Sequence, residues 1–339
     1  MMSLRLPAVT VFLSLLFSLA TMCGAQGTDS ITSPDSDRDG LSDAQEQVLL
    51  VQFEPIFLMA KNDCSHVPSE FAQDIVIPTV EKENGTIYGQ AFVGRSSSAS
   101  TPMVELHFYH LWKTDCGEHG HLLDTEHVAT LLQHFEDGSD SGRWEAIYWY
   151  AAAHENTVCD VSQIARATTL GATDHGAKIW VSPGKHASYL NETLCRKGCG
   201  ADRCEAMVPL VTVKIVNLGE IGHPMNGSAF IASSAWPLAD KMTSTNFPPE
   251  PLARLNEMPA TDIAWFNAGR HPVQGVIAVS GSTGAAIANS GENTTAAISV
   301  AGDSTGNALQ KSYRSTKHAL GKATRSVGEA LHVTPKPKE

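Results

Sequence analysis

The chain has 339 residues, of which 42% are hydrophobic and 18% charged, and its formal net charge is -12. This composition belongs to a folded protein with material for one large or two average domains, not to a disordered chain. The negative charge argues against a general binder of nucleic acid or of anionic membranes, so no nucleic-acid partner is expected.

Residues 1–25 predict export. A single Arg is followed by an apolar run and then by small residues, which is the pattern of a secretory signal peptide and too short for a spanning helix. Cys23 leaves a lipoprotein form open, although Met22 is larger than the residue usual at an acylation site. No later apolar segment is long enough to cross a bilayer, so we expect a secreted, periplasmic or extracellular protein without a transmembrane segment.

The next segment, residues 26–47, contains the acidic stretch "DSDRDGLSDAQE". An EF-hand loop binds calcium through oxygens at alternate positions, with Gly at its turn and Glu at its end. Gly40 occupies the turn position here, and a helix is expected to follow. The sequence therefore predicts a single calcium-binding loop. Its ligands would be Asp35, Asp37, Asp39, the Leu41 carbonyl, Asp43 and Glu46.

Residues 48–272 are expected to form a mainly β domain. Short runs rich in β-branched and aromatic residues alternate with turn signals, and few long helices separate them, which favours an antiparallel β-sandwich. Residues 127–136 could be a strand or a short helix, and residues 237–272 are expected to be irregular. The predicted strands lie at 74–80, 85–93, 103–112, 143–154, 177–182 and 210–216.

Two segments follow this domain. Residues 273–307 are rich in Gly, Ala, Ser and Thr and predict a low-complexity linker. Residues 308–339 regain helical spacing and carry an excess of Lys and Arg, so they predict a basic amphipathic helical tail. Such a tail can dock on the acidic body of the protein or lie on a membrane.

Once the signal peptide is removed with Cys23, six cysteines remain. An even number in an exported chain predicts three disulfides, with their pairing left open. The run "CRKGCGADRC" at 195–204 could instead hold zinc.

A second group of metal- and proton-binding side chains lies in "GHLLDTEHV", residues 120–128. If this stretch is extended, Asp124 and Glu126 share one face and His127 lies on the other. His121 could reach the same site as the carboxylates from the preceding turn. One His and two carboxylates suit a divalent cation such as magnesium, calcium or manganese. The alternative is an exposed, solvated strand edge.

The piece "DTEHV" looks like the D-W-E-H-V core of the vacuolar protein sorting-associated protein 62 family. The stretch is also similar to the G-H-R-H-D-W-E heptapeptide of the necrosis- and ethylene-inducing peptide family, in which His, Asp and Glu spaced H-x-x-D-x-E bind a divalent metal. His121, Asp124 and Glu126 match that spacing. An upstream Asp also joins the metal in that family, and Asp115 is the nearest candidate, at a different offset. Thr125 stands where the families have Trp.

Three further stretches resemble elements of the first family in the same order: "FEPIF" (53–57), "VSPGKHASYL" (181–190) and "IVNLGE" (215–220). The resemblance spans residues 48–236. It implies a β-sandwich with a polar site built from loops, and it adds His186 to the candidates for that site.

Three functions compete. The first is a secreted calcium-binding protein with a second divalent cation in its β-sandwich, which binds a surface, a membrane lipid head group or a glycan. The second is a metal-dependent hydrolase of phosphoesters or esters, with Glu126, His127 or His186 as the base. The third is a structural exported protein without a ligand. We expect the first.

Overall fold

The computed structural model describes residues 34–93, 102–117, 119–136, 142–199, 201–242 and 245–270, with the backbone of 277–278. The predicted signal peptide, most of the linker and the basic tail lie outside these residues. The described chain is mainly β, with antiparallel sheets and few helices. None of its helices is long and apolar enough to cross a membrane.

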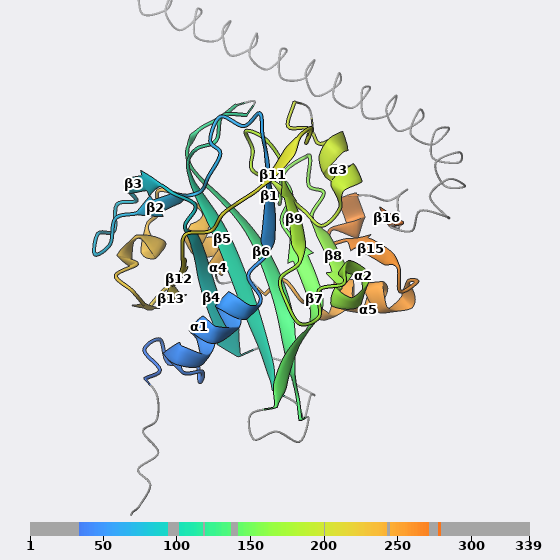
Figure 1. Ribbon diagram of the computed structural model, residues 1–339, viewed down its shortest axis with the longest axis horizontal. Helices are drawn as coiled ribbons and strands as arrows, with labels where there is room; N and C mark the ends of the chain where they lie inside the picture. The colour runs from blue at the N-terminus through green and yellow to red at the C-terminus, as the bar shows by residue number, and fades with distance from the viewer. Residues whose placement is uncertain are drawn as a thin grey trace, which may run out of the picture. The chain divides into compact units, whose positions relative to one another are not determined.

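The larger sheet has eight strands, and its long members β5, β6 and β7 run side by side (Figure 1). All of its neighbouring pairs are antiparallel except β12–β4. In spatial order the strands are β12 (Ile215–Asn217), β4 (Ile87–Val93), β5 (Met103–Thr114), β6 (Leu122–Phe135), β7 (Arg143–Ala151), β8 (Gln163–Arg166), β15 (Asp262–Trp265) and β16 (Ile277–Ala278).

A second sheet has four strands, in which β1 pairs in parallel with β9 and antiparallel with β11. Its order is β10 (Ser188–Tyr189), β9 (Lys178–Val181), β1 (Ile56–Ala60) and β11 (Met207–Pro209). Two small ribbons pair β2 (Ser69–Phe71) with β3 (Val80–Glu83) and β13 (Gly219–Glu220) with β14 (His223–Pro224). The helices are α1 (Asp43–Gln52), α2 (Ala167–Leu170), α3 (Glu192–Lys197), α4 (Leu238–Met242) and α5 (Pro249–Glu257), with the 3-10 turns η1 (Ala229–Ala232) and η2 (Ala268–Arg270).

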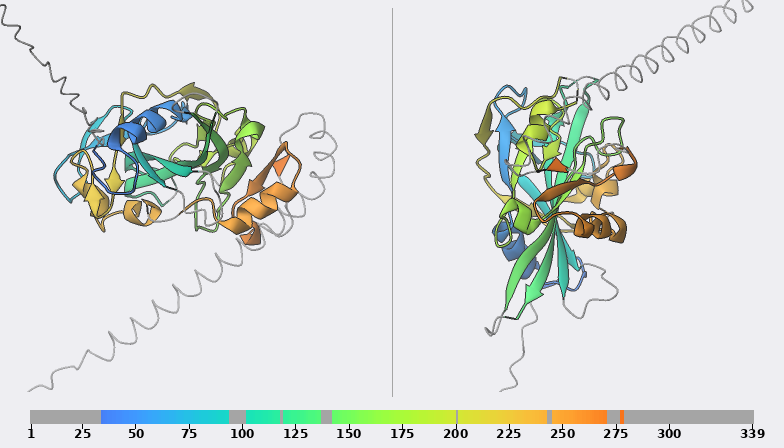
Figure 2. Two further views of the ribbon diagram at one scale, coloured as in Figure 1. Left: turned by 90° about the horizontal axis from the view of Figure 1, so that it is seen from below. Right: turned by 90° about the vertical axis from the view of Figure 1, so that its right-hand side faces the viewer.

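Strand β5 is buried on both faces from Val104 to Trp112, although Glu105, His107 and His110 lie within this stretch. Phe108 and Trp112 share the main core with Phe57 of β1 and Ile179 of β9, so side chains from both sheets meet in one cluster. Tyr109 points to the opposite face, where a second cluster forms with η1 and α4. Figure 2 (right) shows β1 on one side of the long strands and α5 on the other.

Residues close in the chain determine where helix α1 begins and which face it buries. Ser42 caps its first turn, with Oγ accepting a hydrogen bond from Gln45 N. Leu49 and Leu50 are buried in the main core. The helix ends at Gln52, and it confirms the helix expected after the acidic stretch.

Several sequence predictions change in the structure. Residues 127–136 lie in strand β6 up to Phe135, so the helical alternative is wrong. The strand predicted at 74–80 is wrong, since β3 starts at Val80. There, Ile77 is 75% exposed and Asp74 has a positive φ of 58°, so this run is an exposed turn despite its β-branched residues. Of the strand predicted at 210–216, the structure forms only the last two residues, as the start of β12.

Within 237–272, the described residues form α4, α5, β15 and η2 rather than the irregular segment expected. Helix α5 begins with Pro249. Proline is tolerated there because the backbone N–H groups of a helix's first turn have no acceptor within the helix, so none is lost. The guanidinium of Arg166 donates to the carbonyl oxygens of Leu255, Met258 and Pro259 and so satisfies the far end of this helix. A distant Arg therefore supplies what the local sequence lacks.

The expectation of three disulfides is confirmed. Cys64 pairs with Cys116, Cys159 with Cys199, and Cys195 with Cys204. The zinc alternative for 195–204 is wrong because each of its three cysteines is already bonded. Disulfides of this number favour an exported protein.

Candidate functional site

The acidic loop before α1 gathers carboxylates. Asp35, Asp37 and Asp39 each place an oxygen within 4.8 Å of the others. Asp35 also closes the loop on itself, because it accepts hydrogen bonds from Arg38 N at 2.7 Å and Gly40 N at 3.2 Å. Gly40 has a φ of 99°, a left-handed value that glycine adopts without steric cost.

Four oxygens in this loop region are buried without a hydrogen-bond donor: both of Asp37, Oδ2 of Asp39 and Oε1 of Glu46. Burial, reinforced by the neighbouring carboxylates, raises the pKa of Asp37 to about 7 and that of Glu46 to about 8. Buried acceptors normally receive a hydrogen bond or lie against a positive charge. These four oxygens receive no hydrogen bond, so a cation is the partner that would compensate for their burial. Carboxylate oxygens of this kind are the ligands that calcium prefers.

The remaining residues of the predicted calcium loop have other contacts. The carboxylate of Asp43 accepts hydrogen bonds from Ser36 N at 2.7 Å and Ser36 Oγ at 2.6 Å. The side chain of Leu41 is buried in the main core. The structure thus brings together Asp35, Asp37 and Asp39, with Glu46 close enough for the charges of Asp37 and Asp39 to raise its pKa.

The loop is joined to the β-rich body through residues near β12 and β13. Asn217 Nδ2 donates a hydrogen bond to Glu46 Oε2 at 2.6 Å, and both side chains are buried. The charge of Glu220 contributes to the raised pKa values of Asp37 and Asp39. Helix α1 lies beside the lower part of β4 in Figure 1. The acidic loop and α1 are therefore part of the body, not a separate module.

A pocket of about 430 Å³ opens at the beginning of β6. Strand β7 ends opposite Val128, so the preceding residues of β6 have no partner strand on that side. The pocket is lined by the predicted residues His121, Asp124, Glu126 and His127, and by others that include Glu155, Asn156, Asp240, Lys241 and Asn246.

The two predicted carboxylates of the second site both face this pocket, but they differ in their hydrogen-bond partners. Asp124 is engaged, since Oδ1 accepts from Thr125 N at 2.9 Å and Oδ2 lies 2.8 Å from His186 Nδ1. Glu126 Oε2 is buried without a hydrogen bond, 3.6 Å from Lys241 Nζ. Burial raises the pKa of Glu126 to about 8, against the opposing effect of the Lys241 charge.

The other candidates for the second site lie around it. His121 is at the rim, with its side chain 58% exposed and Nε2 3.5 Å from Asp115 Oδ2. Asp115 is paired with Lys185 Nζ at 2.6 Å. His127 lies on the other face of β6, where Nε2 is 3.1 Å from Asn246 Oδ1, and burial holds the pKa of His127 well below its usual range.

His186 is fully buried between two carboxylates. Its Nδ1 lies 2.8 Å from Asp124 Oδ2 and its Nε2 lies 3.5 Å from Asp63 Oδ1. Its ring stacks on Trp112 with centroids 3.8 Å apart. Burial lowers the pKa of His186, but its interactions with the Asp124 and Asp63 carboxylates outweigh this and raise it to about 9. The structure therefore places His186, rather than His121, against Asp124.

Sequence reasoning did not identify Asp63 or Lys241. Both reach their sites from segments distant in the chain, and neither lies in a recognisable motif. Asp63 follows β1, and Lys241 belongs to α4, in the region expected to be irregular.

A buried polar network lies on the face of the eight-stranded sheet opposite the main core. Gln90 Nε2 donates to Glu220 Oε1 at 3.0 Å, and Tyr109 OH donates to Gln90 Oε1 at 3.1 Å. Tyr109 OH is also 3.1 Å from His107 Nδ1, and His107 Nε2 is 2.8 Å from Glu105 Oε1. The network extends from Glu220, whose charge acts on the acidic loop, into the interior.

No family model matches the chain, and no curated protein matches it. Solved structures similar to it are of necrosis- and ethylene-inducing proteins. The structure of NLPPya in complex with glucosamine is 14% identical with a TM-score of 0.33, over 64% of this chain and 94% of that chain. Necrosis and ethylene inducing protein 2 from the causal agent of cocoa's witches' broom disease is 15% identical with a TM-score of 0.30, over 62% and 94%.

The non-toxic HaNLP3 protein is 12% identical with a TM-score of 0.30, over 58% of this chain and 83% of that chain. TM-scores this low carry no argument about the fold or function of this chain. The resemblance to the vacuolar protein sorting-associated protein 62 family stays a prediction.

Proposed function

We propose that the protein is an exported, calcium-binding β-sandwich protein that binds a surface, a lipid head group or a glycan through the pocket at the start of β6. The observation that carries the calcium part is the group of four buried, unpaired carboxylate oxygens around Asp37. The sandwich is supported by the core that the four- and eight-stranded sheets share.

Calcium would supply the missing positive charge. Its ligands would be oxygens of Asp35, Asp37, Asp39 and Glu46 with the Leu41 carbonyl. The position of Asp43 in an EF-hand loop often reaches the ion through a water, which accords with the hydrogen bonds of Asp43 to Ser36. Because Glu46 is also bonded to Asn217, calcium would fasten the loop to the β body.

A second divalent cation, magnesium, calcium or manganese, would be held against Asp124 and Glu126. Glu126 Oε2 supports this position, because it is buried without a hydrogen bond and its close cationic neighbour, Lys241 Nζ, lies 3.6 Å away. His121, at the rim of the pocket, is available to complete the ligand set from the solvent side.

The pocket has the character of a site for a polar, hydroxyl-rich ligand. Carboxylates, the amides of Asn156 and Asn246 and the ammonium of Lys241 line it, so it offers both donors and acceptors. Its volume of about 430 Å³ falls in the range of small-molecule pockets, about 300–1,000 Å³. A sugar, free or in a lipid head group, matches this chemistry, and a cation at Glu126 could bridge to its hydroxyls.

The metal part is tested by elemental mass spectrometry of the purified mature protein. We expect two ions per chain, one lost in Asp37→Ala and the other in Asp124→Ala. The exposed pair partner Asp174 offers a control, since Asp174→Ala should keep both ions. A wild-type protein without calcium would overturn the calcium part.

The binding part is tested on glycan arrays and on liposomes carrying glycosylated lipids, with and without a chelator. We expect binding that Glu126→Gln and chelation both weaken, whereas Glu192→Gln on exposed α3 leaves it unchanged. Binding that ignores both changes would contradict the proposal, and turnover of a phosphoester or ester substrate would favour the hydrolase instead.

A further inference from the structure

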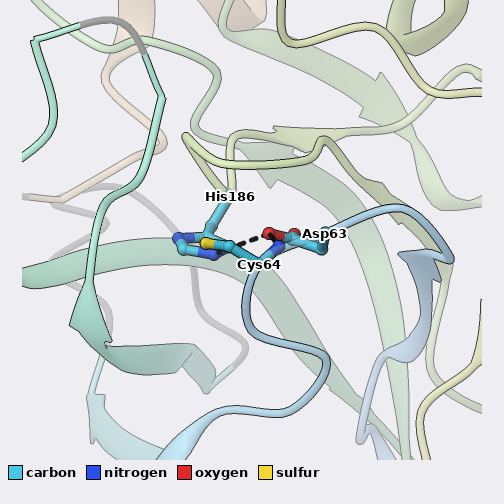
Figure 3. Close-up of side chains that lie close together, drawn as sticks. All are labelled: Asp63, Cys64 and His186. Carbon is cyan, nitrogen blue, oxygen red and sulfur yellow. Dashed lines mark hydrogen bonds and ion pairs between the residues drawn. The ribbon is translucent and has the colours of Figure 1, made fainter.

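A group of metal-binding side chains lies outside both proposed ion sites, between the loops that follow β1 and β9. An oxygen of Asp63, a ring nitrogen of His186 and Sγ of Cys64 all lie within 4.8 Å of one another. Figure 3 shows the Asp63 carboxylate facing the His186 ring, with Cys64 beside them. Cys116, the disulfide partner of Cys64, places its Sγ 4.0 Å from Asp63 Oδ1.

The sheet topology creates this group. Strands β1 and β9 are parallel neighbours, with Met59 opposite Val181, so the loops after them leave the sheet at the same end. Asp63 lies in the first loop and His186 in the second. Gly184 N donates to Asp63 Oδ1 at 3.0 Å and fixes the two loops together.

Two of the donors are buried and have no hydrogen-bond partner. They are Asp63 Oδ2 and His186 Nε2, on side chains that are wholly shielded from solvent. The other ring nitrogen of His186 is held by Asp124 at 2.8 Å. A carboxylate behind the imidazole is the arrangement that orients metal-binding histidines in proteins.

We propose that reduction of the Cys64–Cys116 disulfide by a dithiol uncovers a zinc site formed by Cys64, Cys116, Asp63 and His186. In the oxidised protein the two sulfurs are bonded to each other, which leaves one carboxylate and one imidazole. After reduction the site has two thiolates, an imidazole and a carboxylate, which are the donors and the number that tetrahedral zinc takes.

The chemical step is ordinary thiol–disulfide exchange. The dithiol supplies two electrons and two protons, the bond between the two Sγ atoms breaks, and the reductant leaves as its own disulfide. Zinc then displaces the protons of both thiols, and any proton on His186 Nε2, into solvent.

Accessibility favours this disulfide over the others. Cys64 and Cys116 are both exposed, whereas Cys195 and Cys204 are 0% and 2% exposed. Exchange requires a dithiol to reach a sulfur atom, so limited reduction should open Cys64–Cys116 before Cys195–Cys204.

The test uses the full mature chain, partly reduced with a dithiol that is then removed, and titrated with cobalt as a spectroscopic substitute for zinc. We expect a single cobalt ion per chain with thiolate charge-transfer and tetrahedral absorption bands, which zinc abolishes. Zinc should also protect Cys64 and Cys116 from alkylation, as read by peptide mass spectrometry. The oxidised protein should show neither effect.

Two variants define the ligands: His186→Gln and Asp63→Asn, each expected to weaken cobalt binding by at least about tenfold. The double variant Cys159→Ser with Cys199→Ser, which removes a different disulfide, should keep the bands. Reduced wild type without thiolate bands would overturn the proposal, and so would bands that Asp63→Asn leaves unchanged. Calcium and ligand binding are measured on the oxidised protein, so failure here is distinguishable from failure of the proposed function.

Discussion

Asn217 Nδ2 donates a hydrogen bond to Glu46 Oε2 at 2.6 Å, across 171 residues of sequence. Glu46 ends the acidic loop, and Asn217 ends β12 at the edge of the eight-stranded sheet. An ion bound by Glu46 would therefore hold α1 and the loop against the sheet. The stability of the whole body should depend on that ion.

The first prediction follows from this link. Removing calcium should lower the melting temperature of the wild type, because an ion that binds only the folded state stabilises it. At a calcium concentration about 100 times the dissociation constant, the gain is about 2.7 kcal/mol. Asp37→Ala should lose the part of this response that comes from the loop ion, so its melting temperature should change less with calcium than that of the wild type. Asp174→Ala, at an exposed carboxylate, should keep the wild-type response, and an unresponsive wild type would refute the prediction.

The second prediction concerns pH in the calcium-free protein. Asp37 and Glu46 have ordinary pKa values of 3.8 and 4.5, raised in the fold to about 7 and about 8. Between these limits the folded state binds more protons than the unfolded state, so the free energy of unfolding should fall as pH rises from 5 to 8. Below the lower values the penalty is absent.

Urea unfolding at several pH values, on protein freed of calcium by dialysis, measures this effect. Glu46→Gln cannot ionise, so the difference between wild type and this variant isolates the contribution of Glu46. Calcium should remove the decline, since it favours the ionised carboxylates, and should bind more tightly as pH rises. If the free energy of unfolding of the calcium-free wild type changed with pH in the same way as that of Glu46→Gln, the raised pKa of Glu46 would be refuted.

The third prediction concerns the buried polar network. Tyr109→Phe removes the hydroxyl that donates to Gln90 Oε1 and contacts His107 Nδ1. An acceptor left unpaired in the interior costs about 1–3 kcal/mol, which denaturant unfolding would detect. Tyr148→Phe is the matched control, because its hydroxyl donates to Asn256 at the surface, and it should change stability by at most about 0.5 kcal/mol. Equal effects would mean that the network contributes nothing.

The parts of this protein that sequence could predict are those set by near neighbours. Strands at 85–93, 103–112 and 177–182 are found close to their predicted bounds because β-branched and aromatic runs between turns specify them locally. The acidic loop likewise gathers Asp35, Asp37 and Asp39, since their spacing alone brings them to one point.

Contacts set by strand pairing could not be predicted. Asp63 meets His186 because β1 and β9 are parallel neighbours, and Lys241 reaches Glu126 because α4 packs near the start of β6. No pattern in the local sequence indicates either contact. The strand predicted at 74–80 is wrong for a related reason. Its β-branched residues favour an extended strand, but the described structure pairs no neighbouring strand with residues 74–79.

The last prediction concerns the charge on His186. Asp124→Asn keeps the shape of the side chain but removes the negative charge 2.8 Å from His186 Nδ1. The imidazolium would then be buried with Asp63 as its remaining anionic partner, at a cost of about 3 kcal/mol in the free energy of unfolding. The pKa of His186 is raised from 6.5 to about 9. The stabilisation is therefore complete below pH 6.5 and lost as pH rises through 9, so the difference between wild type and variant should shrink above pH 9.

Asp174→Asn provides the comparison, because the Asp174–His175 pair has the same chemistry at 2.6 Å on the surface. Water already solvates both partners there, so the substitution should change the free energy of unfolding little. Denaturant unfolding of the three proteins at pH 6 and pH 10 decides the matter: a loss in Asp124→Asn no larger than that in Asp174→Asn would show that His186 is not held as a buried cation.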